Sequence, residues 1–357
     1  MYSESDLQAA VDAKVLTPEA AMAFRSHIAS VRSTPGADEE SFRLITGFND
    51  IFVSIAAVIL LVAVAWIGAS IHTALGGVFV AVSAWFLAEY FTRKRRMALP
   101  SIILVLAFAG GVFASMVGLG VEHGEAIFGN NLGETVGAMI IGTMALITAG
   151  ATWAHWKRFM VPITVAAGTA ALAATAVAMV LAITGMPNRD GTLPMVLVLI
   201  AGLGVFTLAM WWDRSDRVRQ TRRSDVAFWL HLLAAPMIAH PVFHLLGVTD
   251  GSDIGSGAAV MVVAIYVLFG LIALAIDRRA LLVSALAYVL FALTQLFREF
   301  GAVELNVALT AFVIGSALLL LSAFWQNARA VVVAMLPDNL ANQLPATTRT
   351  VSPIPAS

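Results

Sequence analysis

The sequence predicts an all-α fold: a polytopic transmembrane helical bundle of about ten spans, preceded by a small N-terminal cytoplasmic helical hairpin. Composition is the first reason, because 60% of the residues are hydrophobic, 12% are charged and the mean hydropathy is +0.88. Soluble domains are about 45–50% apolar and about 25% charged. Apolar runs of about 20 residues are the second reason, since each is long enough for a helix to cross roughly 30 Å of hydrocarbon. Backbone groups need internal partners in lipid, so these runs are expected to be helical.

The distribution of basic residues is the third reason. Of the 21 Lys and Arg residues, all except Arg189 and Arg298 fall on one side of the predicted membrane. The positive-inside rule then places both termini of the chain in the cytoplasm. The predicted transmembrane bundle occupies residues 41–325. Its spans cover about residues 50–70, 73–92, 99–119, 134–152, 160–184, 193–212, 226–247, 257–276, 280–297 and 304–324.

Residues 1–40 are predicted to form the cytoplasmic hairpin and a linker. Leu7, Val11 and Val15 keep a four-residue spacing that suits one face of a first helix. The second helix is expected to begin at Thr17-Pro18-Glu19, which combines an N-cap residue, a first-turn proline and a first-turn acid. A unit of this size builds little core alone. We therefore expect it to dock on a protein partner, on another copy or on the bundle.

The C-terminal region is expected to have two parts. Residues 326–344 are predicted to form an interfacial amphipathic segment, because they carry several apolar side chains and a helix break at Pro337. Residues 345–357 are rich in Pro, Thr, Ser and Ala, which indicates a disordered tail.

Several function classes are excluded or disfavoured by the composition. The chain has no cysteine, which excludes thiolate metal sites and cysteine nucleophiles. The net charge of −1 implies no global attraction to nucleic acid. The sequence contains no phosphate-binding glycine loop, zinc-protease helix motif or nucleophile elbow. These observations favour a non-enzymatic protein without a predicted cofactor, and they leave a divalent metal as a possible one.

The seventh span contains three of the seven histidines. His240 and His244 lie four residues apart, so they share a helix face and are separated by about 6 Å along its axis. This spacing suits two ligands of one metal ion. His231 lies nine residues before His240, on a different face, and is a candidate for proton coupling or substrate binding. The alternative for all three is a hydrogen bond across a helix interface.

Glu89 is the second candidate for proton coupling or substrate binding. It lies near the inner end of the second span, four residues before Arg93. That order also favours an ordinary ion pair along one helix face, which is the alternative interpretation.

The N-terminal pattern of Asp6-Leu7, Val11 and Leu16-Thr17-Pro18-Glu19-Ala20 resembles the opening of a bacterial family of predicted membrane proteins of unknown function, with a DUF2157-like N-terminal region. The resemblance covers roughly the first 150 residues. It implies a helical hairpin followed by transmembrane helices in the bacterial inner membrane. It brings no established substrate and no catalytic residues.

Three functional hypotheses follow. The first is a non-enzymatic inner-membrane protein whose cytoplasmic hairpin docks a partner or another copy. The second is a secondary transporter of a small solute or metal ion, because ten spans with both termini inside are similar in architecture to the drug and metabolite transporters, which have two inverted five-helix halves. The third is a membrane enzyme or haem protein, for which no second axial ligand is evident.

Overall fold

The computed structural model describes residues 7, 10–24, 48–128, 133–185, 191–217, 219, 221–248, 255–299 and 305–345. Its regular elements are all helical, as predicted. The chain divides into two compact units, residues 1–41 and residues 42–357. The predicted disordered tail lies outside the described residues, except for Pro345.

The first unit contains two short helical stretches, at residues 10–12 and 18–24. The backbone N–H of Ala20 donates to Thr17 Oγ1 at 3.1 Å, so Thr17 caps the second stretch as expected. Val15 does not continue the first helix, contrary to the expected spacing. Lys14 adopts a left-handed backbone conformation with φ of 57°, and the N–H of Val15 turns back to the carbonyl of Ala10. This closes the helix and leaves Val15 76% exposed.

The second unit contains ten helices that are long and apolar enough to cross a membrane, and the prediction of a multi-pass membrane protein is confirmed. The chain therefore contacts a lipid bilayer. The helices are α3 (Phe48–Ile71), α4 (Thr73–Ala88) with its π-helical extension η1 (Glu89–Lys94), α5 (Ala98–Phe128), α6 (Glu134–Phe159), α7 (Ile163–Thr184), α8 (Thr192–Arg214), α9 (Arg222–Leu245), α10 (Ser256–Ile276), α11 (Ala280–Glu299) and α12 (Asn306–Ala323).

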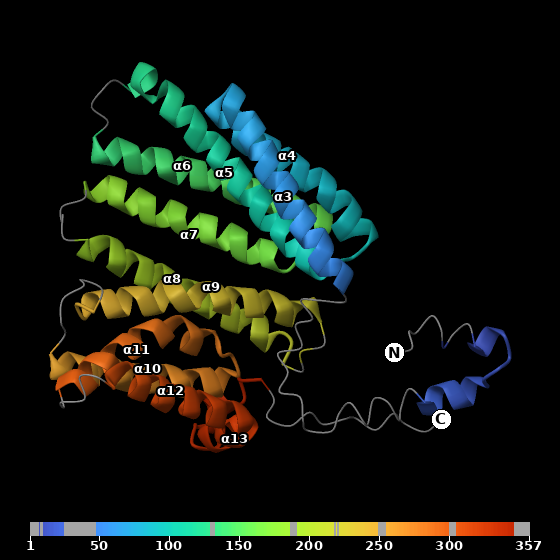
Figure 1. Cartoon of the computed structure of the whole chain (residues 1–357), viewed down its shortest axis with the longest axis vertical. Coiled ribbons are helices and arrows are strands. Elements are labelled where there is room, and N and C mark those ends of the chain that lie inside the picture. Colours follow the sequence, from blue (N-terminus) through green and yellow to red (C-terminus); the bar gives the residue numbers. More distant parts are fainter. Residues whose placement is uncertain are drawn as a thin grey trace. The chain divides into compact units, whose positions relative to one another are not determined.

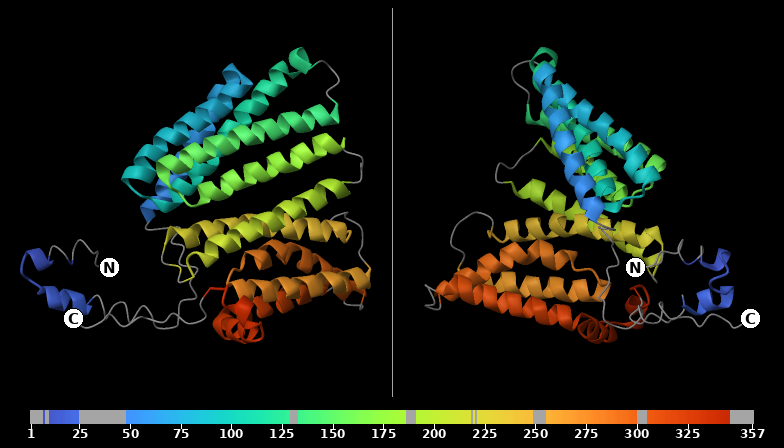
Figure 2. Two further views of the ribbon diagram at one scale, coloured as in Figure 1. Left: turned by 180° about the vertical axis from the view of Figure 1, so that it is seen from behind. Right: turned by 45° about the vertical axis from the view of Figure 1, so that its right-hand side comes forward.

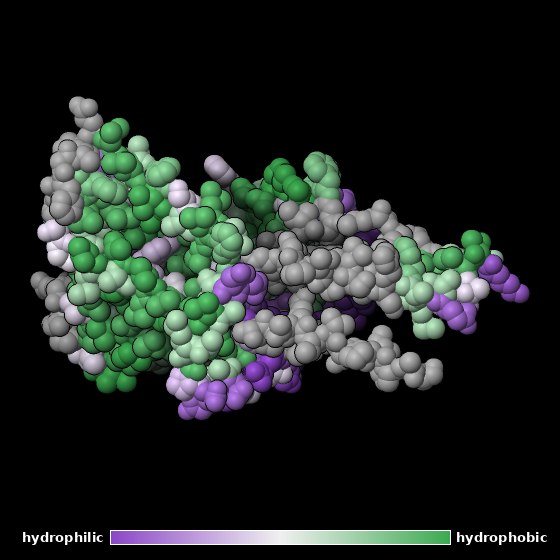
Figure 3. Space-filling model, turned by 90° about the horizontal axis from the view of Figure 1, so that it is seen from below, coloured by the Kyte–Doolittle hydropathy of each residue, from purple (hydrophilic) through white to green (hydrophobic). Residues whose placement is uncertain are grey.

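The helices of the bundle succeed one another in chain order, from α3–α5 through α6 and α7 to α10–α12 (Figures 1 and 2). Small residues allow the closest approaches. A Cβ atom added at Gly77 of α4 would lie 2.3 Å from the backbone nitrogen of Ser115 on α5. The very short connection between α3 and α4 is made by His72, whose Nδ1 accepts the N–H of Ala74 at 3.3 Å and caps α4. Hydrophobic residues cover most of the face seen in Figure 3, and hydrophilic residues gather toward one end.

The two halves of the bundle pack their helices in different ways. In the first half α4 packs on α3 and on α5. In the second half the equivalent of α4 is α9, which packs on α8 in the same way but has its other main contact in this half with α11 rather than with α10. The packing therefore gives no support to an inverted repeat of five and five helices.

The largest hydrophobic core surrounds α9. Of the most apolar 18-residue stretch of α9, 56% is buried, against 17% to 39% for the other nine spans. Leu230, Ala234 and Phe243 are fully removed from solvent. The span that carries the three histidines is thus the central helix of the bundle, and it stays helical through Pro236 and Pro241.

Two short helices follow the last span: α13 (Trp325–Ala334) and α14 (Asp338–Ala341). Trp325 packs with Ala273, Leu274 and Leu282 of α10 and α11. Pro337 separates the two helices, at the position where a break is expected.

Candidate functional site

A buried triad of Asp213, His231 and Arg278 connects α8 and α9 to the turn between α10 and α11. Arg278 donates from Nη2 to Asp213 Oδ1 at 2.7 Å, and His231 Nε2 lies 3.0 Å from Asp213 Oδ2. Arg278 Nη2 also donates to the carbonyl oxygen of Ser224 at 3.2 Å. The side chains of Asp213, His231 and Arg278 are 1%, 2% and 4% exposed. The three side chains are therefore almost completely buried, and water scarcely reaches them.

The geometry of the triad shows which protonation state of His231 fits the site. An ionised carboxylate only accepts hydrogen bonds, so His231 Nε2 carries the proton shared with Asp213. His231 Nδ1 is buried without a hydrogen-bond partner among the described residues. A second proton there would leave a buried N–H unsatisfied and would add a positive charge beside Arg278. The site therefore fits a neutral imidazole.

A second set of ionic contacts begins at the neighbouring residue, Asp277. Its carboxylate accepts from Arg219 Nη1 at 2.7 Å and from the indole Nε1 of Trp325 at 2.8 Å. Arg329 Nε lies 3.8 Å from the same carboxylate. The guanidinium of Arg279 lies over the Trp325 ring, 4.6 Å from its centroid. These contacts connect the turn after α10 to the loop before α9 and to α13.

Arg329 and a further arginine, Arg217, hold the end of the described chain. Arg329 Nη2 donates to the carbonyl oxygen of Pro345 at 2.6 Å, and Arg217 Nε donates to that of Leu344 at 3.0 Å. Burial lowers the pKa of Arg219 and of Arg329 from the usual value, although both still have Asp277 as a partner. We call Asp213, Arg219, His231, Asp277, Arg278 and Arg329 the ionic cluster.

The ionic cluster limits what its carboxylates can do. Asp213 faces a guanidinium and an imidazole N–H, and Asp277 faces a guanidinium and an indole N–H. Both carboxylates are thus already bound by donors, and a cation or a proton would have to displace one of them. This arrangement is typical of a structural network.

The histidines proposed as metal ligands lie toward the other end of α9. The ring centroids of His240 and His244 are 6.3 Å apart, with an angle of 34° between the ring planes. His240 Nδ1 is 2.6 Å from the hydroxyl of Tyr288 on α11, and the Tyr288 ring stacks on Phe243. Among the described residues, no group of three His, Asp or Glu side chains lies close enough to hold a metal ion. The metal site at His240 and His244 stays a prediction.

Glu89 lies where η1 meets α6. The expected pair with Arg93 is present at 3.2 Å. Arg158 at the end of α6 makes a second, bidentate contact, with Nε and Nη2 at 2.6 and 3.0 Å from the Glu89 carboxylate. Two guanidiniums therefore hold Glu89, and a role in proton coupling or substrate binding stays a prediction.

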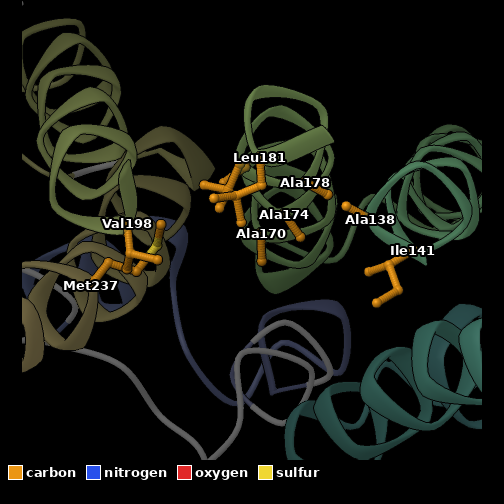
Figure 4. A pocket seen from close by; sticks show the side chains of 10 residues that line it. Ala138, Ile141, Ala170, Ala174, Ala178, Leu181, Val198 and Met237 are labelled. Atoms are coloured by element: carbon orange, nitrogen blue, oxygen red, sulfur yellow. The ribbon is translucent and has the colours of Figure 1, made fainter. Parts of the chain in front are cut away.

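A cavity of about 380 Å³ lies at the junction of α6, α7, α8 and α9. Ala170, Ala174 and Ala178 of α7 face it, between Ile141 of α6 and Met237 of α9 (Figure 4). Every lining residue is apolar: Ala138, Ile141, Ala170, Ala173, Ala174, Val177, Ala178, Leu181, Val198 and Met237. Such a lining offers no hydrogen bond to a polar solute.

Sequence reasoning identified His231 but missed Asp213 and Arg278. Asp213 follows the tryptophan pair at the end of the sixth span, and Arg278 belongs to a basic pair that also marks the topology. One signal was available: Asp213 is an acidic residue at the end of the sixth span, directly before the most basic loop of the bundle.

Comparisons with protein-family models, with curated proteins and with solved structures found no match to this chain.

Proposed function

We propose that this multi-pass membrane protein is a non-enzymatic anchor in the bacterial inner membrane, whose N-terminal unit docks a protein partner or a second copy at the cytoplasmic face. The observation that carries the proposal is that apolar side chains are exposed on the N-terminal unit, which is a separate compact unit. Val15 is 76% and Met22 57% exposed in the unit of residues 1–41. Such side chains on so small a unit favour an interface.

The chemistry of the bundle supports the same proposal. One of its buried carboxylates in the spans, Asp213, is already paired with Arg278 and His231. Its cavity has an apolar lining throughout. The position of almost all Lys and Arg residues at one end of the spans supports a cytoplasmic location for the N-terminal unit. The resemblance of the N-terminal pattern to a bacterial membrane-protein family supports the inner membrane.

A photo-crosslinking experiment on the full-length protein in cells tests this function. A photoreactive phenylalanine analogue is placed at Met22 and, as a matched control, at Ala20, which is exposed on the opposite side of the same short helix. We expect a discrete crosslinked species from position 22, absent when Val15→Asp is also introduced, and none from position 20. Mass spectrometry then distinguishes a partner from a second copy. The proposal fails if position 22 gives no discrete species, or gives one that position 20 shares.

The second candidate function is secondary transport, and the pair of His231 and Asp213 within the spans favours it. A histidine-coupled transporter would move protons together with a small solute or metal ion. Purified protein in liposomes that contain a pH-sensitive dye tests this candidate. A solute-dependent pH change that His231→Gln abolishes would support transport, and its absence across solutes and metal ions would favour the anchor.

A further inference from the structure

The helix α13 presents three different faces. At 100° per residue, Trp325, Ala328 and Val332 point one way, and these side chains pack with α10 and α11. A second row, Phe324, Val331 and Met335, follows the spacing of seven and four residues that keeps side chains on one face of a helix. This second row is adjacent to the packed face, about 90° away around the helix.

The second row is apolar and exposed. Phe324 is 58%, Val331 55% and Met335 77% exposed, and all three lie outside the ten candidate spans. Gln326 and Ala330 are exposed on the side of α13 away from this row. Asn327, four residues before Val331, shares the face of the row and is its one polar member. One helix therefore has a face on the bundle, a face of large apolar side chains and a face suited to water.

The position of α13 along the chain fixes its depth. The last span ends at Ala323 and α13 begins at Trp325, so one residue separates them. The helix must therefore start at the level where span α12 leaves the hydrocarbon. The contacts of Trp325 and Arg329 with Asp277 then hold it against the arginine-rich end of the bundle.

The side chains around α13 carry positive charges, which an anionic leaflet attracts. Arg279 lies over the ring of Trp325. Arg214, Arg222 and Arg223 are exposed at the same end of α8 and α9. Phosphate groups of anionic lipids gather at such positions.

We propose that α13 is an interfacial helix that lies on an anionic membrane leaflet. Its row of Phe324, Val331 and Met335 inserts into the boundary between the headgroups and the acyl chains. The packed row keeps the helix on the bundle, and Gln326 and Ala330 face water. Three properties select lipid as the occupant, namely the start of α13 at the membrane level, the apolar exposed row and the arginines beside it. The proposal is independent of the N-terminal unit.

Fluorescence quenching on single-cysteine variants tests whether the apolar row of α13 is inserted in lipid. The chain has no cysteine, so each introduced cysteine is the one labelling position. Val331→Cys and Met335→Cys probe the apolar row, and Ala330→Cys and Gln326→Cys are matched controls on the water-facing side. Each full-length variant is labelled with an environment-sensitive dye in vesicles of phosphatidylglycerol and phosphatidylethanolamine. Quenching is measured with brominated lipid and with iodide.

We expect brominated lipid to quench positions 331 and 335 several-fold more strongly than positions 330 and 326, and iodide to give the reverse order. Equal quenching at all four positions would overturn the proposal. Protection of positions 331 and 335 from both quenchers would also overturn it, because protein rather than lipid would then cover the row. Circular dichroism of each labelled variant confirms that the bundle is folded.

Discussion

Trp325 donates its indole N–H to the Asp277 carboxylate at 2.8 Å, although 48 residues separate them in the chain. Asp277 ends α10 in a left-handed conformation with φ of 57°, which turns its side chain toward α13 and Arg219. One short turn therefore serves two purposes. Asp277 holds the C-terminal helix, and the next residue, Arg278, holds α8 and α9.

Trp325→Phe removes this hydrogen bond and keeps an aromatic ring under Arg279. Because hydrogen bonds to charged groups contribute about 1.5–3 kcal/mol, we expect the free energy of unfolding to fall by about 2 kcal/mol. Denaturant titration in detergent measures the change. Trp211→Phe is the control, since Trp211 is 63% exposed. Equal effects at the two positions would contradict a role for the indole N–H.

Arg278→Met leaves the Asp213 carboxylate buried with His231 alone. Breaking a buried ion pair from one side costs about 3–5 kcal/mol, and we expect a loss of that size in the same titration. The double variant Asp213→Asn/Arg278→Met should be less destabilised than Arg278→Met, because no uncompensated charge remains. Arg223→Met, at an exposed position, should stay within about 0.5 kcal/mol of the natural protein. Additive effects of the two single changes would contradict the pairing.

Gly77→Ala tests the contact between α4 and α5. The new Cβ would lie 2.3 Å from the backbone nitrogen of Ser115 and 2.5 Å from the carbonyl oxygen of Gly111, and backbone atoms cannot rotate away. We expect a loss of about 1–3 kcal/mol, as in other overpacked cores. Gly110→Ala meets nothing within 4 Å, and alanine favours helix by about 1 kcal/mol. Thermal unfolding should therefore separate the two variants in opposite directions.

Ala174→Leu tests the apolar cavity. The added side chain enters the space of about 380 Å³ at the junction of α6, α7, α8 and α9, so thermal stability should not fall. Ala166→Leu is the matched change on the same helix, where Ala166 packs in the main core at 6% exposure. It should cost about 1–3 kcal/mol. A large loss from Ala174→Leu would mean that the cavity is closed in solution.

Metal content tests the histidine pair. His240 is engaged by Tyr288, and the described residues supply no third carboxylate or imidazole beside His244. We therefore expect substoichiometric metal, equal in the natural protein and in His240→Ala/His244→Ala. Inductively coupled plasma mass spectrometry on purified protein gives the answer. One equivalent of metal that the double variant loses would establish a metal site on α9.

The sequence by itself determined which segments of the bundle are helical and where most of these helices end, although α5 and α6 continue to Phe128 and Phe159, beyond the predicted ends at 119 and 152. Uninterrupted apolar runs must be helical in lipid, because no water satisfies their backbone groups. Charged residues and helix-capping residues stop each run, which is why α10 was placed within a residue of its observed bounds. The N-cap at Thr17 was equally local, and the wrong assignment of Val15 arose from a left-handed residue that no hydrophobic spacing reveals.

Only the tertiary structure decided which faces of these helices meet. A soluble helix marks its buried face by contrast with a polar face, but lipid-facing and protein-facing positions of a span are both apolar. The sequence therefore predicted the span of His231 and could not predict its partner. Asp213 and Arg278 lie 65 residues apart, and their contact depends on how α8, α9 and the turn after α10 pack. The packing of apolar side chains decided which charged side chains meet. The sequence does not show which way each apolar side chain faces, so it could not predict these pairs.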